Sequence, residues 1–596
     1  LIPGVNITET YFGYTSIEFR GNLQTHYNNK SLLLINNHPM HNIINGSYYL
    51  EQIPVESIEK IEIIRGPGSI LYGTNAFAGV IKVVTKNGKS KGDDGLHLKM
   101  TGGSFGTLSP SISFGKKEKD LELFFNVSMT DSDGYPFIVD GDEENRTGEI
   151  PYKNDTIHSL VSFKYKSIRM NAGYFENKKS KFGLIPTLAS TGLRNLKGWF
   201  FDITFTRKLS DRMSLSISGY FDHISKEEDI EWYPPLASFQ SSGTGEKVFQ
   251  EYSGYKYGID VQSSYKLSKN TSITGGILYE NQTADPYTFQ SDVTGEVSEW
   301  AGVVWDDQQN AYDLSAYCQF DAQIDRFGII GGIRINDNKG YGVNITPRFA
   351  VVYSISTPLS LKFLYGKAFR SPSIFETSVN TPNVLYGDPE LKPEGIDTVD
   401  IGLDYMIGSR HNIRLNFFYI STNKLIARSG MVPAGERGAT NNTPKYANSD
   451  GGQKFNGLEG EIKGTFTNKS VYFFNFSYIF NGIEDADDSD IQFLQKITAN
   501  LGFNLKLGQR FTISPYIQYR GKREGVTTKG MPSETDPYLL MNLIIKIEPL
   551  RNLELILSAK NLSNENYRYP EYIRRNIVSS QGGPEHSIFG TLIYRF

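Results

Sequence analysis

The sequence predicts an all-β chain, in which an antiparallel transmembrane β-barrel of about 22 strands follows a small N-terminal domain of mixed α/β structure. Three observations predict this fold. Stretches of about ten residues alternate apolar and polar side chains along most of the chain. The connections between these stretches are short and long by turns. Aromatic residues make up 13% of the 596 residues, although the mean hydropathy is only −0.36.

The composition excludes several other classes of protein. No apolar run approaches the ~18 residues of a transmembrane helix, whereas barrel strands alternate lipid-facing and lumen-facing residues and so stay polar on average. The net charge of −4 is small for this length, which gives no reason to expect a nucleic-acid partner. An array of soluble β-sandwiches is the alternative, but it would not need aromatic rows on nearly every strand.

The predicted strands and their connections show the barrel pattern. Between residues 471 and 481, Phe474 and Tyr478 fall on one face and Asn475 and Ser477 on the other. Short turns at one end and long loops at the other are typical of outer-membrane barrels. We expect short turns at residues 116–120, 209–212, 267–270, 357–358, 408–410, 467–469, 507–509 and 549–552. We expect long loops at residues 131–155, 177–198, 225–252, 284–309, 370–393, 423–455, 522–536 and 563–585.

The N-terminal residues break this pattern. We expect residues 1–90 to form a separate domain and residues 91–596 to form the barrel. Apolar strands are predicted at residues 32–35, 58–64 and 79–85, each bounded by Gly, Pro or Asn.

The most specific stretch of the sequence lies in this domain. Residues 61–69 read IEIIRGPGS, residues 71–73 read LYG and residues 79–81 read GVI. Gly and Pro in the first of these allow a tight reversal between two strands. Together these segments resemble the plug signature of TonB-dependent receptors.

The resemblance extends along the chain. Residues 561–562, followed by Tyr567, resemble the penultimate-strand motif of this family. The terminal Phe596 resembles the aromatic residue that the barrel-assembly machinery recognises. Residues 365–372 and 389–394 are similar to the paired box that flanks a central extracellular loop in many members.

This resemblance implies an outer-membrane receptor that imports a scarce nutrient into the periplasm. It implies the TonB–ExbB–ExbD complex as energy-transducing partner, outer-membrane lipid around the barrel and a monomeric state. The energy-coupling box and the first plug strands of the family should precede Pro3, where only Leu1 and Ile2 stand, so we expect the plug to lack its N-terminus. A diffusion porin or an adhesion barrel would share the barrel, but a porin would lack the plug signature.

No pattern of residues indicates enzymatic chemistry. The sequence shows no phosphate-binding loop, catalytic triad or cluster of Cys and His, so we expect no catalytic residues, no cofactor and no structural metal. The loop at residues 131–155 is rich in Asp and Glu but lacks the spacing of a calcium loop, which favours a solvated acidic loop over a cation site.

Three residues after the first buried strand are candidate ligand contacts. His38, Met40 and His41 follow the LLLI strand, where the plug apex of the family faces the external vestibule. Two imidazoles and a thioether could ligate haem iron or contact a metal chelate. The alternative is a pair of solvent-exposed loop histidines. Residues 373–388, where haem receptors carry a histidine, contain none.

Aromatic residues of the long loops are further candidates. Trp232, Tyr233, Trp300 and Trp305 could stack on the aryl groups of a catecholate siderophore, or could belong to the aromatic girdle at the strand ends. We therefore expect a ferric siderophore as the ligand, mainly because siderophore receptors are frequent in the family. Haem is the second candidate and cobalamin the third.

Four charged residues are candidates for holding the plug in place. Arg20 and Arg65 each precede a plug glycine, and a guanidinium inside a barrel is costly unless carboxylates neutralise it. Glu394 and Glu459 begin strands after long loops, and the resemblance implies that they point into the lumen. We expect Arg20 and Arg65 to pair with these glutamates. Solvated lumen glutamates are the alternative.

Overall fold

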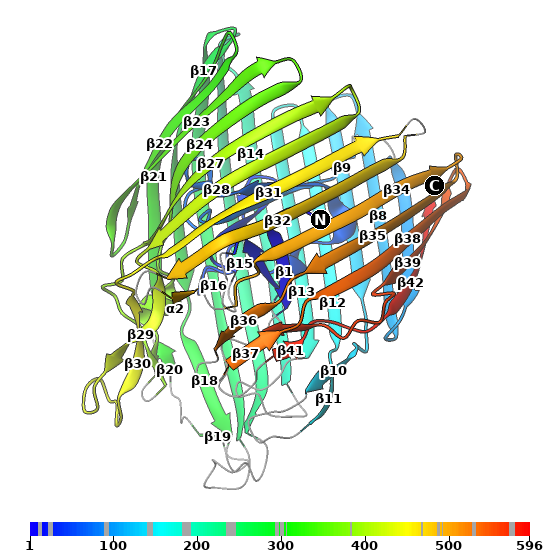
Figure 1. Cartoon of the computed structure of the whole chain (residues 1–596). Coiled ribbons are helices and arrows are strands. Elements are labelled where there is room, and N and C mark those ends of the chain that lie inside the picture. The colour runs from blue at the N-terminus through cyan, green and yellow to red at the C-terminus, as the bar shows by residue number, and fades with distance from the viewer. Residues whose placement is uncertain are drawn as a thin grey trace.

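A computed structural model shows a closed barrel with a smaller domain inside it (Figure 1). It describes residues 1–9, 15–21, 28–88, 94–139, 147–180, 192–233, 246–292, 297–298, 303–305, 307–381, 384–466, 469–484, 489–490, 493–526, 532–570 and 579–596. Among these residues, no helix has the length and apolar character that crossing a bilayer requires.

The barrel wall is one closed sheet of 22 antiparallel strands, as the sequence predicts. The last strand pairs with the first, so that Leu592 lies opposite Met100 and Tyr594 opposite Leu98. The strands of the wall are β7 (Gly95–Gly103), β8 (Thr107–Glu118), β9 (Leu121–Thr130), β12 (Asn154–Tyr165), β13 (Ile168–Ser180), β14 (Gly192–Lys208), β15 (Met213–Tyr233), β16 (Glu246–Ser268), β17 (Thr271–Ala284), β21 (Gln309–Ile324), β22 (Phe327–Asn338), β23 (Gly342–Ser356), β24 (Leu359–Arg370), β27 (Glu394–Ile407), β28 (His411–Asn423), β31 (Gln453–Thr465), β32 (Val471–Glu484), β34 (Ile497–Leu507), β35 (Phe511–Arg520), β38 (Tyr538–Leu550), β39 (Leu553–Lys560) and β42 (Ser587–Arg595).

Short turns and long connections lie at opposite ends of the barrel, which confirms the expected asymmetry. Residues 209–212 join β14 to β15 and residues 408–410 join β27 to β28, whereas residues 371–393 separate β24 from β27. The long connections gather at the lower end of the barrel in Figure 1, which we call the external end. They contain β10 (Pro136–Val139), β11 (Gly148–Pro151), β18 (Tyr287–Asp292), β19 (Val297–Ser298), β20 (Val303–Trp305), α2 (Ile374–Ser378), β25 (Asn380–Thr381), β26 (Leu385–Tyr386), β29 (Ile426–Val432), β30 (Thr443–Asn448), β33 (Ser489–Asp490), β36 (Arg523–Val526), β37 (Pro532–Thr535), β40 (Arg568–Pro570) and β41 (Ser579–Gln581).

Side chains alternate across the wall as the strand period requires. On β32, Phe474 and Tyr478 are 40% and 43% exposed, whereas Asn475 and Ser477 between them are buried toward the lumen. Apolar and aromatic side chains therefore cover the outer surface, where lipid replaces water. This arrangement explains a high aromatic content in a chain of low mean hydropathy.

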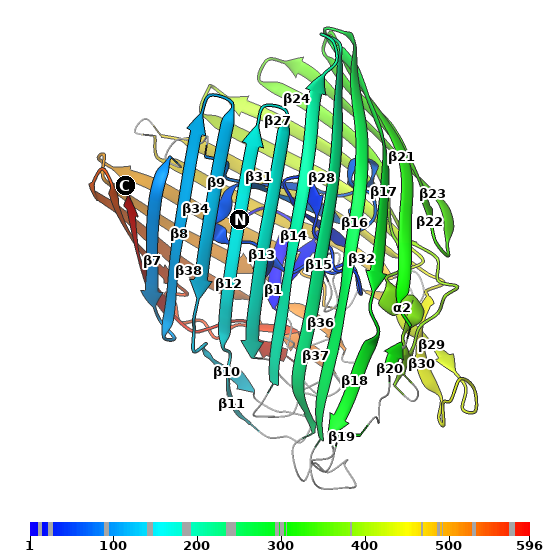
Figure 2. The same ribbon diagram turned by 180° about the vertical axis from the view of Figure 1, so that it is seen from behind.

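The N-terminal domain, which we call the plug, lies inside the barrel (Figure 2). Its main sheet has the order β4-β3-β6-β5, with β3 and β6 parallel and β5 antiparallel to β6. The three expected strands are present, but β5 lies at the sheet edge, where Ile61 is 53% exposed. The plug contains β1 (Val5–Glu9), β2 (Thr15–Phe19), β3 (Ser31–Ile35), β4 (His38–Pro39), η1 (Leu50–Gln52), η2 (Val55–Ser57), β5 (Ile58–Arg65), α1 (Ser69–Tyr72) and β6 (Gly79–Thr85).

An apolar core joins the plug to the wall. Leu33 and Ile81 of the plug belong to the same buried cluster as Phe200 and Phe418 of the wall. In the order of the sequence, β6 is the last strand of the plug and β7 is the first strand of the wall. The expected domain boundary near residue 90 falls outside the described residues and stays a prediction.

Candidate plug attachment and ligand site

Two arginines of the plug bind one glutamate of the wall. Arg20 directly follows β2, with a φ of 50°. Its Nε and Nη2 lie 3.0 Å from the two carboxylate oxygens of Glu459 on β31. Arg65 ends β5 and places Nη1 2.7 Å from Glu459 Oε2 and 3.0 Å from the carbonyl oxygen of Pro3. Charge-assisted, bidentate contacts of this kind are both strong and directional.

A second carboxylate completes the surroundings of Arg20. Asp400 Oδ1 lies 2.9 Å from Arg20 Nη2, and the ring of Phe418 lies 4.6 Å from the guanidinium carbon. Arg20 and Glu459 are 4% and 2% exposed. Burial lowers the pKa of Arg20, but Glu459 and Asp400 outweigh it and hold this pKa above its ordinary value. The charge is therefore retained inside the barrel.

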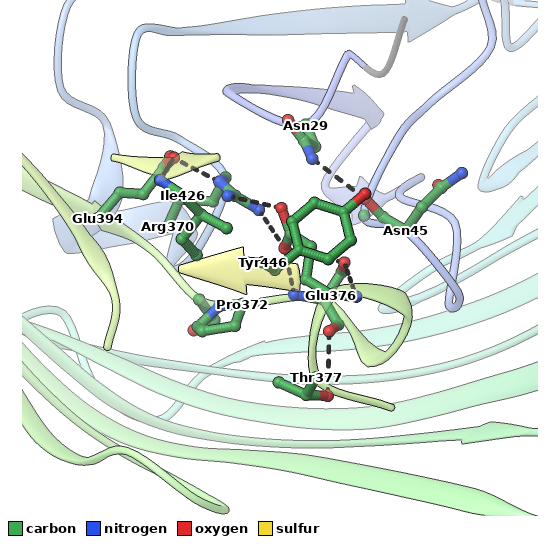
Figure 3. A network of polar contacts seen from close by, with 12 residues as sticks. Asn29, Asn45, Arg370, Pro372, Glu376, Thr377, Glu394, Ile426 and Tyr446 are labelled. Atoms are coloured by element: carbon green, nitrogen blue, oxygen red, sulfur yellow. Dashed lines mark hydrogen bonds and ion pairs between the residues drawn. The ribbon is translucent and has the colours of Figure 1, made fainter. Parts of the chain in front are cut away.

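Glu394 belongs to another ion pair, at the external end of the wall. Its Oε2 lies 2.7 Å from Nε of Arg370, and its Oε1 accepts the backbone N–H of Ile426 at 2.8 Å. The two remaining nitrogens of Arg370 lie 2.9 and 3.0 Å from the carboxylate of Glu376 in α2 (Figure 3). Arg370 thus ties β24 and β27 to the helix of the loop between them.

The expected pairing of Glu394 with the plug arginines is therefore corrected. Arg20 and Arg65 contact Glu459, whereas the plug cation nearest to Glu394 is Lys30, at 4.0 Å. The reason is local, because Glu394 pairs across the sheet with Arg370 in the register of β24 and β27.

His38 is buried against the wall instead of facing the vestibule. Its Nε2 lies 2.7 Å from Asp222 and its Nδ1 3.5 Å from Asp202, and its side chain is 1% exposed. Lys256 binds the same Asp222 at 3.0 Å and donates to the carbonyl of Pro39. Burial lowers the pKa of His38, but the two carboxylates outweigh it and raise this pKa to about 9.

Met40 and His41 are also buried. Met40 is 6% exposed and packs in the core that joins plug and wall. His41 is 8% exposed, and its Nε2 lies 3.1 Å from Glu280 on β17. The alternative of solvent-exposed loop histidines is thus wrong, whereas the role of His38, Met40 and His41 as ligand contacts stays a prediction. Wall carboxylates contact both imidazoles, which sequence patterns do not show.

One of these residues reaches a cavity. His41 lines a space of about 40 Å³ between the plug, β21, β22 and the residues after Arg370. Within the described part of the chain, His41 Nδ1 and Asn338 Oδ1, whose residues both line this space, have no hydrogen-bond partner. A space of this size holds a few water molecules or one polar group of a larger ligand.

Two family models match the chain. TonB dependent receptor-like, beta-barrel, matches residues 133–562, and TonB-dependent Receptor Plug Domain matches residues 1–80. This chain belongs to the TonB-dependent receptor family. Receptors of this family are located in the bacterial outer membrane, and so is this one.

Curated relatives of the receptor carry different names. It is 23% identical to "Vitamin B12 transporter BtuB" of Photobacterium profundum over 67% of this chain and 60% of that protein. It is 21% identical to "Iron-regulated outer membrane virulence protein" of Vibrio cholerae over 87% of this chain and 78% of that protein. The match to the vitamin B12 transporter thus spans about 60% of that protein's length.

Solved structures share the fold of the receptor. The ferric enterobactin receptor PfeA of Pseudomonas aeruginosa superposes with a TM-score of 0.77 at 15% identity, over all of this chain and 95% of that one. The siderophore receptor PirA of Acinetobacter baumannii has a TM-score of 0.76 at 16% identity, over 100% and 95%. Copper transporter OprC has a TM-score of 0.79 at 14% identity, with the same coverage.

One of the candidate aromatic residues, Trp305, lies on β20 in an external loop of the receptor. Trp305 is 4% exposed, packs edge to face against Tyr287, and donates its indole N–H to the carbonyl of Asp285 at 2.8 Å. Trp232 and Tyr233 end β15, but their side chains fall outside the described residues, as does the whole of Trp300. Their role as ligand contacts stays a prediction.

Further attachments of the plug were not expected from the sequence. Glu18 on β2 forms a buried bidentate pair with Arg523 on β36, at 2.9 and 2.7 Å. Arg334 on β22 donates to the carbonyl of Ile70 in α1 at 3.3 Å. Glu18 and Arg523 are 505 positions apart and belong to no common motif, so no sequence signal could have paired them. The described residues include no group of three or more metal-ligating side chains placed to hold an ion.

Proposed function

We propose that this receptor actively imports a ferric siderophore into the periplasm and is energised by the TonB–ExbB–ExbD complex. The observation that carries the proposal is the plug inside the closed barrel, held by the buried contacts of Arg20 and Arg65 with Glu459. Removing one partner of such a buried ion pair strongly destabilises the folded protein, because the other charge is left buried and unpaired. Because the plug occupies the lumen, a large solute passes only if the plug rearranges, and energy for that step comes from outside the chain.

Support for an iron chelate comes from the relatives. The names of PfeA and PirA refer to siderophores, and that of the Vibrio cholerae relative refers to iron regulation. The external end of the barrel also carries an aromatic cluster that includes Tyr49, Tyr287 and Trp305. Such rings suit the flat aryl groups of a catecholate if the loops open. His41 Nδ1 offers one further polar contact at the cavity.

Cobalamin is the second candidate, favoured by the name of the vitamin B12 transporter that the chain resembles. Haem is a weaker candidate than cobalamin, because His38 and His41 already face wall carboxylates. The Nε2 of each imidazole ligates iron only after its contact with the carboxylate breaks.

Uptake by cells that carry this receptor as their sole TonB-dependent protein tests the proposal. Radiolabelled ferric enterobactin, cobalamin and haem are supplied separately, with and without a functional TonB. We expect accumulation of the ferric siderophore only in cells with TonB. Accumulation of cobalamin or haem instead of the siderophore would overturn the proposed substrate. Equal uptake of the siderophore with and without TonB would indicate a porin.

A further inference from the structure

The plug is not attached evenly around the barrel. The wall strands from β9 to β34, in the order of the closed sheet, carry side chains that are buried against the plug. They include Asn126, Leu160, Phe200, Arg334 and Phe418. The ion pairs of the plug also involve this side, including Glu459 of β31, Asp222 of β15 and Glu280 of β17. Apolar packing and charge pairing thus hold the plug against the same part of the wall.

Four neighbouring strands lie in a part of the wall that contributes nothing to the apolar cores of the plug. β38, β39, β42 and β7 lie side by side where the barrel closes, and we call them the closing arc. Within the described residues, no residue of the closing arc or of the flanking β8, β34 and β35 belongs to either of the two apolar cores that join the plug to the wall. β22 and β23 contribute none either, but Arg334 of β22 binds the plug at Ile70. Half-exposed side chains on the inward face of the closing arc are Thr101, Ile556, Ser558, Phe589 and Thr591.

The register of the closing arc shows which face these residues share. Ile556 lies opposite Thr591, which lies opposite Thr101, and the hydroxyls of the two threonines are 2.9 Å apart. Lys99, two positions before Thr101 on the same face, binds Glu56 of the plug, so this face is the inward one. On the other face, Leu592 is 44% exposed, as expected for lipid contact.

We propose that the substrate passes between the plug and the closing arc, while the plug remains attached to the opposite wall. This route rests on the proposed transport function. Local opening follows the weakest packing, because the segments with the fewest buried contacts open at the lowest free energy. Opening along the closing arc breaks the pair of Lys99 with Glu56 but leaves the contacts of Glu459, Asp222 and Glu280 intact.

The chemistry of the inward face suits this role. Ile556, Ser558, Phe589 and Thr591 present hydroxyl and apolar groups. Among the charged residues of this face, Lys546 and Arg595 both pair with Glu554, at 3.0 and 2.8 Å, and Lys99 pairs with Glu56 of the plug. A conduit must contact its substrate weakly enough to release it. A surface of hydroxyl and apolar groups, with its neighbouring charges already paired, fits a bulky metal chelate with a partly apolar ligand shell and does not hold it by a strong charge.

A matched pair of bulky substitutions tests the route. Thr591→Trp narrows the closing arc, and Thr204→Trp is its control on β14. Both threonines face inward, are half-exposed, and hydrogen-bond a hydroxyl on the next strand, Thr101 at 2.9 Å or Ser218 at 3.0 Å. With ferric enterobactin as probe, we expect Thr591→Trp to slow uptake by about tenfold or more, because an obstructed path raises the barrier to transport. Binding to the cell surface stays unchanged, as does uptake by Thr204→Trp.

Thiol labelling tests the route independently of the substrate. Thr591→Cys and Thr204→Cys are made in a Cys318→Ser background, and energised cells are exposed to a hydrophilic maleimide that does not cross the membrane. We expect TonB-dependent labelling at position 591 and none at position 204. Stronger labelling at 204, or uninhibited uptake by Thr591→Trp in a barrel of normal yield, would overturn the route. If the wild type does not import ferric enterobactin, the proposed substrate fails, and the labelling still decides the route.

Discussion

Gly4 lies so close to Glu459 that a Cβ added to Gly4 would stand 2.0 Å from Glu459 Oε1. Gly4 also has a φ of +69°, which L side chains rarely adopt. The carboxylate that binds both plug arginines therefore contacts a backbone position that has no room for a side chain. This contact allows the attachment to be disturbed without changing any charge.

We predict that Gly4→Ala loosens the plug. The added methyl must displace the Glu459 carboxylate from Arg20 and Arg65. Gly408→Ala is the control, because Gly408 has a φ of +60° and nothing lies within 4 Å of its added Cβ. This substitution therefore introduces the backbone strain without a steric clash. Ion conductance in planar bilayers should rise for Gly4→Ala and not for Gly408→Ala. Equal conductance in both would contradict the role of this contact.

Glu459→Gln should weaken the same attachment by removing charge. Two guanidinium groups would then face one neutral amide, and removing one partner of a buried pair costs about 3–5 kcal/mol. We expect a lower thermal midpoint of the plug and a higher leak. Glu461→Gln is the control on the same strand face, because Glu461 is 21% exposed and lies 3.5 Å from Arg414. Removing the charge of Glu461 should lower the free energy of unfolding by less than about 1 kcal/mol.

His38 should make the stability of the plug depend on pH. Its pKa rises from 6.5 to about 9 in the folded protein. The stabilisation is therefore complete below pH 6.5 and is lost as the pH rises through about 9, where Asp202 and Asp222 lose their positive partner. Lys256 and Tyr220 also face this group, and Lys256 keeps one contact with Asp222.

The measurement is the thermal midpoint of wild type and His38→Gln across this range of pH. We expect the wild type to lose up to about 3 kcal/mol of stability on going from neutral to alkaline pH, since each unit of pKa shift corresponds to about 1.4 kcal/mol. His38→Gln should start lower and change less. His586→Gln is the control, because His586 is an exposed loop residue. A wild type and a His38→Gln protein with parallel pH profiles would rule out the imidazole as the cause.

Deleting Phe596 should lower the amount of folded barrel. Phe596 is 69% exposed on the outside, packs edge to face on Tyr594 at 4.8 Å, and donates its N–H to Leu96 of the first wall strand at 2.9 Å. Heat-modifiable gel mobility measures the folded fraction. Phe596→Tyr keeps the ring and should fold normally. Equal folded yield after deletion would show that assembly does not depend on this residue.

Much of the fold follows from local patterns in the sequence. Strand alternation repeats every two residues and turn residues punctuate it, so the barrel, its strand number and its asymmetric ends could all be predicted. The plug signature at residues 61–69 indicated the family in the same way. Each of these features depends on residues that are close neighbours in the chain.

The partners of the charged residues depended on the tertiary structure. Arg20 and Glu459 are 439 positions apart, and only the register of the closed sheet brings them together. The resemblance indicated Glu459, but it also indicated Glu394, which the strand register gives to Arg370. His38 and His41 look like exposed loop residues because a polar loop has the same composition whether it faces water or buried carboxylates. The sequence by itself thus determined the barrel and the plug, whereas the closure of the sheet around the plug decided which charges meet.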